Sequence, residues 1–129
     1  MKKIFFIILF FLIPFNVNAG CSDQLGDGVD YTNCVMTEGQ DLSGSFLPNS
    51  NLSFASVIQV NFDKSIMMNS ILAFGTFSES TFIRANLYES NLQGANLEKS
   101  DFTSANLTRA KFIGATLIEA NFQNANLIE

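Results

Sequence analysis

The chain has 129 residues, of which 47% are apolar and 15% are charged, and it contains 14 Phe, 2 Cys, no His and no Trp. This length suits one small domain. Because His is the usual general base of a Ser or Cys triad and the commonest ligand of transition metals, its absence argues against most hydrolase and metalloenzyme mechanisms. The formal net charge of −5 argues against a nucleic-acid-binding surface, which depends on clustered Lys and Arg.

The N-terminal segment 1–19 is typical of a bacterial secretory signal. Two lysines precede an apolar run over residues 4–15, which is shorter than the roughly 20 residues that a membrane-spanning helix needs. Val17 and Ala19 are small residues that suit cleavage after Ala19. We therefore expect the mature chain to be secreted or periplasmic, with no membrane span.

Cys21 has two alternative roles. In an oxidising compartment, Cys21 and Cys34 are expected to form a disulfide, which would contribute about 3 kcal/mol to stability in the chain-entropy view. Alternatively, Ala19-Gly20-Cys21 resembles the end of a lipobox, although Asn18 stands where such a box prefers an apolar residue. The protein would then be a membrane-anchored lipoprotein acylated at Cys21. The two roles exclude each other, because acylation of Cys21 leaves Cys34 unpaired.

From residue 40 onward the sequence repeats with a period of five. Every fifth residue from Leu42 to Leu127 is apolar, and the residue two positions earlier is Ala, Ser or Gly except at Gln40 and Val60. A period of five fits neither an amphipathic helix nor a simple strand. It indicates short extended units that each end in a turn, so that the chain winds into a solenoid with hydrogen bonds between successive coils.

The segments Ala85-Asn86-Leu87, Ala105-Asn106-Leu107 and Ala125-Asn126-Leu127 resemble the A-[DN]-[LF]-x-x signature of the pentapeptide-repeat family. This resemblance covers residues 40–129. It implies an all-β fold, a right-handed quadrilateral β-helix of about 4.5 coils with 20 residues in each. We expect residues 20–39 to form a short N-terminal cap, since the first coil of a solenoid otherwise leaves its backbone and core open.

The 20-residue coil agrees with the placement of the phenylalanines. Side chains spaced by 20 should stack as one internal column, where aromatic rings pack well on each other. The column predicted in this way contains Phe62, Phe82, Phe102 and Phe122.

The signature decays in the first coils, where apolar residues replace Asn or Asp or stand at positions expected to face solvent. These residues form a candidate interaction patch: Phe46, Phe54, Ile58, Ile66, Met68, Ile71 and Phe74. Monomers rarely leave such a patch bare. Either residues 20–39 cover it, or it binds a protein partner or a second copy of the chain. The uncapped C-terminal coil is another candidate surface, and the family resemblance implies dimerisation at that end.

No residue of the sequence is a candidate for catalysis, and we expect no metal or cofactor. We predict a non-enzymatic, secreted or periplasmic module with a structural or protein-interaction role. A DNA-mimic protein that binds topoisomerase, a class that the family resemblance also implies, is an alternative. It is disfavoured by the export signal and because Asp and Glu outnumber Lys and Arg by only eight to five within residues 40–129.

Overall fold

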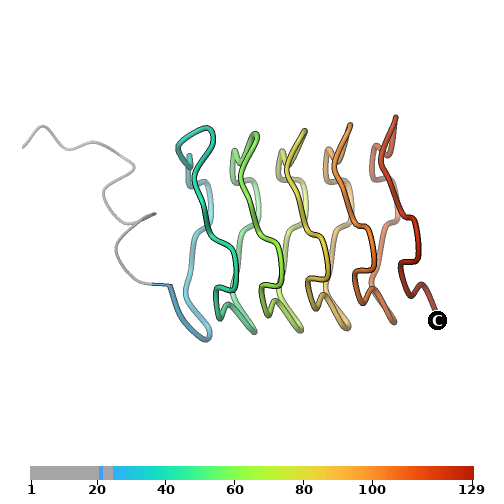
Figure 1. The fold of residues 1–129 in the computed structure, drawn as a ribbon. Helices are drawn as coiled ribbons and strands as arrows, with labels where there is room; N and C mark the ends of the chain where they lie inside the picture. The colour runs from blue at the N-terminus through green and yellow to red at the C-terminus, as the bar shows by residue number, and fades with distance from the viewer. Residues whose placement is uncertain (1–20, 22–24) are drawn as a thin grey trace, which may run out of the picture.

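The computed structural model describes residues 21 and 25–129, which wind into a solenoid whose coils stack along one axis (Figure 1). These residues contain no helix and no strand longer than a single bridge residue. None of them therefore belongs to a helix that could cross a membrane. Parallel bridges join residues 20 apart, from Asp41↔Asn61 to Asn106↔Asn126. Because bridge residues recur every five positions, each coil contains four repeats.

The four repeats of a coil define four sides of the solenoid, which we name A to D in chain order by their central residues. Sides A and C are opposite each other, as are sides B and D. Side A contains Leu42, Phe62, Phe82, Phe102 and Phe122, and side B contains Leu47, Met67, Leu87, Leu107 and Leu127. Side C contains Tyr31, Leu52, Leu72, Leu92 and Phe112, and side D contains Met36, Val57, Phe77, Leu97 and Leu117.

Each repeat consists of a bridge residue, a buried central residue and a tight turn. In a typical repeat, Asn86 is the bridge residue and Leu87 is fully buried. The N–H of Ser90 donates to the carbonyl of Leu87 at 3.1 Å, and Glu89 closes the turn with a φ of 55°. The Asn86 side-chain oxygen accepts from the N–H of Tyr88 at 3.2 Å, which stabilises the turn. This local bond explains why Asn and Asp recur at the bridge position.

The core is a set of stacked internal columns. The predicted phenylalanine column is present on side A, with ring centroids 5.1, 4.8 and 5.1 Å apart along it and ring planes within 7° of parallel. Small residues occupy the inner corners, where a hydroxyl can bind the coil above: Ser70 Oγ donates to the carbonyl of Leu47 at 2.7 Å. The five-residue period therefore places large side chains inside and small ones at the corners.

The segment expected to cap the solenoid is itself wound as a further coil. Asp30 and Val35 form parallel bridges with Asn51 and Ser56, at a spacing of 21 residues instead of 20. The central residues of this coil, which include Tyr31, are buried. One additional residue between the Val35 and Asp41 bridges shifts the register, so a search in strict steps of five stops at residue 40.

Candidate interaction surface

Five of the seven predicted patch residues are exposed. Phe46, Phe54 and Phe74 are 54%, 58% and 53% accessible, and Ile58 and Ile71 are also exposed. Ile66 and Met68 are intermediate. The described residues 25–39 therefore wind above this patch without covering it, which leaves an unusually apolar exterior on the first coils.

The structure divides the patch among three sides. Phe46 and Ile66 are bridge partners on side B, which also carries Met68. Phe54 and Phe74 lie at the corner between sides C and D, where their rings stack with centroids 5.5 Å apart and planes 14° from parallel. Ile71 is a bridge residue of side C, and Ile58 follows the central residue of its repeat on side D. The stacked phenylalanines are the most compact part of the patch.

Phe54 and Phe74 have an unfavourable backbone conformation. Each has a φ of 58°, in the left-handed region that bulky residues rarely adopt. The equivalent residues of the next two coils are Gly94 and Gly114. Gly94 makes room for the ring, because a Cβ there would come within 2.5 Å of Phe74 Cδ1. The same conformation recurs at the turn position of the other repeats, where the other non-Gly residues with positive φ are all polar. The pair is therefore exceptional in its aromatic side chains and not in its backbone.

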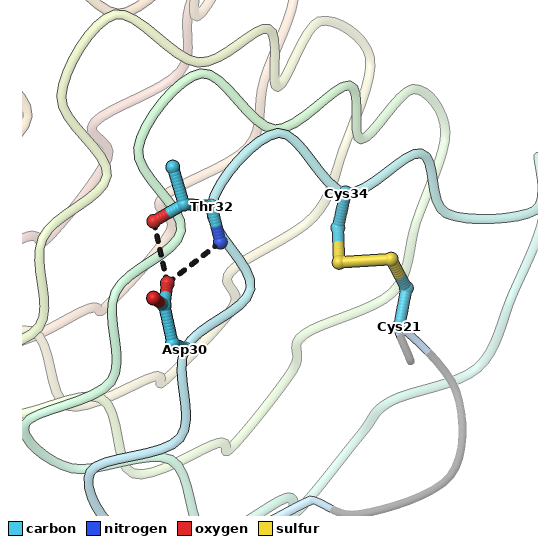
Figure 2. The surroundings of a disulfide bond; sticks show 4 residues. All are labelled: Cys21, Asp30, Thr32 and Cys34. Atoms are coloured by element: carbon cyan, nitrogen blue, oxygen red, sulfur yellow. Dashed lines mark hydrogen bonds between the residues drawn. A yellow bond between two sulfur atoms is a disulfide. The ribbon is translucent and has the colours of Figure 1, made fainter. Parts of the chain in front are cut away.

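Two exposed carboxylates of the solenoid, Glu89 and Asp30, accept hydrogen bonds from other side chains. Arg109 donates to the Glu89 carboxylate at 2.9 Å, and this bond lowers the pKa of Glu89 and raises that of Arg109. At the first coil, Asp30 accepts hydrogen bonds from the hydroxyl and the backbone N–H of Thr32, which lower the pKa of its carboxyl (Figure 2). Both carboxylates are therefore charged at neutral pH.

The two cysteines form a disulfide at the N-terminal end of the solenoid (Figure 2). Their Cα atoms are 5.6 Å apart, and both side chains belong to the hydrophobic core. Cys34 occupies an inner corner, the position that Ala55 takes in the next coil. The disulfide thus fastens Cys21 over the end of the core.

Sequence reasoning missed two exposed apolar residues of the first described coil, Leu25 and Val35. Val35 is a bridge residue above Ser56. Because their spacing is 21 residues, a count in steps of five does not place Val35 at a bridge position. At the other end, the last coil exposes further apolar side chains, listed here by decreasing accessibility: Ile113, Ile128, Ile118, Leu127 and Leu117. Of these, Leu117 and Leu127 hold central positions whose equivalents in the preceding coils are buried.

Comparison with protein families matches the description "Pentapeptide repeats" in 8 copies, over residues 69–103 and 105–129. The chain belongs to the pentapeptide-repeat family. Among solved structures it is similar to a pentapeptide repeat protein, Rfr23, from the cyanobacterium Cyanothece 51142. The identity is 28% and the TM-score 0.67, over 67% of this chain and 59% of Rfr23. The chain thus spans 59% of the length of that protein.

Two further pentapeptide repeat proteins have lower scores. HetL from the cyanobacterium Nostoc sp. strain PCC 7120 is 19% identical, with a TM-score of 0.29 over 77% of this chain and 67% of its own. AT2G44920 from the Arabidopsis thaliana thylakoid lumen is 23% identical, with a TM-score of 0.30 over 72% and 68%. Comparison with curated proteins gives no match. The family and the likeness to Rfr23 imply that this pentapeptide-repeat solenoid is a right-handed β-helix.

The matched region begins at residue 69, whereas the bridges begin at Asp30. The coils upstream of residue 69 therefore keep the winding of the family while their outward residues depart from its signature. Most of the apolar patch lies in these divergent coils, with Ile71 and Phe74 just beyond them.

Proposed function

We propose that this pentapeptide-repeat protein is an exported, non-enzymatic module that recognises a protein through the exposed apolar residues of its first coils. The observation that carries the proposal is the Phe54–Phe74 pair, which is stacked, more than half accessible and placed at turn positions that otherwise hold polar residues or Gly. Neither ring contributes to the core, so core packing does not explain why Phe occupies these two positions. A non-enzymatic role agrees with the family and with the absence of His from the sequence.

The interaction role is tested with the double variant Phe54→Asp/Phe74→Asp. We expect it to abolish capture of a partner, or self-association, while the far-ultraviolet circular dichroism stays that of a β-rich fold, because both side chains point outward. The matched control is Ser104→Asp/Asn124→Asp, which adds two charges at left-handed corner residues of consecutive coils on side A. Equal binding by both variants would contradict the proposal. Loss of folding in the phenylalanine variant alone would show that the pair is internal packing.

The proposed export rests on the leader of residues 1–19, which lies outside the described residues, and is supported by the disulfide, since disulfides persist in oxidising compartments. Intact mass spectrometry of the protein from its native host, without reductant, tests it. We expect a chain that begins at Gly20 and is two hydrogen atoms lighter than the reduced form. A mass increase from lipid on Cys21 would favour the lipoprotein instead, because an acylated sulfur cannot pair with Cys34.

A homodimer through the C-terminal coil stays a prediction. It is supported by the exposure of Leu117 and Leu127, and by backbone N–H groups of the last described coil, such as those of Phe112 and Phe122, that donate to no backbone carbonyl. The DNA-mimic alternative stays disfavoured by the proposed export and because Asp and Glu outnumber Lys and Arg by only eight to five within residues 40–129. Native mass spectrometry of a Leu117→Lys/Leu127→Lys variant tests the dimer, which should dissociate.

A further inference from the structure

Side C differs from the rest of the surface in its charges. Its bridge residues form one continuous ladder down the solenoid: Asp30, Asn51, Ile71, Asn91 and Lys111. The third and fourth residues of its repeats are uncharged, and all of them except the buried Ala73 are at least partly accessible: Thr32, Asn33, Ser53, Phe54, Ala73, Phe74, Gln93, Gly94, Ile113 and Gly114. Side C is therefore a neutral, partly apolar face with one acid at its first coil and one base at its last.

We propose that side C binds a second copy of the chain, face to face, with the two solenoid axes antiparallel. This inference rests on the interaction role proposed above and names a partner for it. A two-fold axis that lies across the face at the Ile71 coil reverses the order of the coils. Asp30 of one copy then lies opposite Lys111 of the other, and this pair occurs twice.

The same two-fold rotation also brings the other residues of side C opposite compatible partners. In the bridge ladder, Asn51 lies opposite Asn91 and Ile71 meets its own symmetry mate. At the corner between sides C and D, Phe54 lies opposite Gly94 and Phe74 meets its mate. The bulky first coils of one copy therefore face the small residues of the later coils of the other, as an isologous interface requires. The exposed apolar residues of side C all gain cover: Phe54, Ile71, Phe74 and Ile113, which lies opposite Thr32.

Charge selects this arrangement over the alternatives. A parallel face-to-face pair would place Asp30 on Asp30 and Lys111 on Lys111, which is repulsive. The other sides each carry acids among their outward residues in the middle coils, such as Asp63 on side A, Glu89 on side B and Glu79 on side D. A neutral face with opposite charges at its two ends meets its own copy without any like-charge pair.

A charge swap in the full-length, disulfide-bonded chain tests the inference by sedimentation equilibrium. We expect Lys111→Asp to weaken the dimer about tenfold, since both symmetric pairs become repulsive. Asp30→Lys should act similarly, and the combined Asp30→Lys/Lys111→Asp variant should restore affinity to within about threefold. The control is Asp101→Lys on side A, because Asp101 accepts the same two hydrogen bonds from Thr103 that Asp30 accepts from Thr32.

A cross-link reports the geometry independently of the charges. Ile71→Cys should form an intermolecular disulfide across the two-fold axis, whereas Ile66→Cys, a bridge residue of the same coil on side B, should not. Any of four results would overturn the inference. The chain stays monomeric, neither charge reversal weakens the dimer, the combined variant does not restore the affinity, or the two cysteine variants cross-link equally. If Phe54→Asp/Phe74→Asp still abolishes capture of another protein in that case, the interaction role stands and only the second copy is wrong.

Discussion

The internal column of Phe62, Phe82, Phe102 and Phe122 and the external pair of Phe54 and Phe74 have the same spacing of 20 residues. Inside, neighbouring centroids are 4.8 to 5.1 Å apart, and the three upper side chains have no accessible surface. Outside, the centroids are 5.5 Å apart, each side chain is more than half accessible and the backbone is left-handed.

This difference separates folding from recognition. Stacking in steps of one coil follows from the repeat wherever aromatic residues share a row, so a stack alone does not identify a core. The internal column removes apolar area from water, whereas the external pair leaves it exposed. The internal column therefore explains why the chain folds, and the external pair indicates where it binds.

The strongest way to separate the two stacks is to place the same charge in each. We expect Phe102→Asp to prevent folding, because an unpaired carboxylate inside a dry column costs more than about 4 kcal/mol, close to the whole stability of a small domain. Phe54→Asp should change the free energy of unfolding by less than about 1 kcal/mol, since its side chain is exposed. Far-ultraviolet circular dichroism and thermal unfolding of both variants measure this. Similar losses in the two would contradict the assignment of inside and outside.

Much of this division could be predicted from the sequence, because the solenoid converts sequence spacing directly into position. The steps of five gave the central and corner rows, and steps of 20 gave the phenylalanine column and the bridge register. The outward position of Phe54 and Phe74 followed from the same count. The disulfide between Cys21 and Cys34 was expected from their number and the compartment, independently of the repeat.

The rest depended on features that the period does not contain. The first coil was hidden by a single additional residue before Asp41, which disrupts the spacing but not the bridges. The stacking of Phe74 over Gly94 depends on χ angles and on a missing Cβ, neither of which the pattern of apolar residues encodes. Similarly, Gly75 replaces the usual Ala because a Cβ there would come within 2.5 Å of the Phe77 ring, a compensation visible only in three dimensions.

Substitution of Gly94, which makes room for the Phe74 ring, tests how the external pair is packed. Gly94→Ala introduces a side chain at a φ of 64° and also forces the Phe74 ring to move, so we expect a loss of about 2 kcal/mol. Gly114→Ala has a φ of 71° with nothing within 4 Å, so it should lose about 1 kcal/mol from the backbone alone. Urea unfolding gives both values.

A double-mutant cycle isolates the ring contact from the backbone cost. In a Phe74→Ala background, the loss caused by Gly94→Ala should fall to that of Gly114→Ala, because no ring remains to be displaced. An unchanged loss would mean that the ring moves freely and that the external stack is not held in place by Gly94.

Two buried serines at inner corners test how much a hydrogen bond between coils stabilises the core. Ser70 Oγ donates to the Leu47 carbonyl of the coil above at 2.7 Å, whereas Ser65 Oγ has no hydrogen-bond partner among the described residues. Both side chains have no accessible surface. We expect Ser70→Ala to lose about 1 kcal/mol, the net value of one buried hydrogen bond. Ser65→Ala should lose nothing or gain up to about 1 kcal/mol, because it removes an unpaired buried hydroxyl.

The urea midpoints of the two variants, compared at equal slope, measure this difference. Since the same atom is removed from equally buried corners, any difference between the two variants reports the hydrogen bond between coils. Equal losses would show that the Ser65 hydroxyl finds a partner in solution and that the core is hydrogen-bonded at both corners.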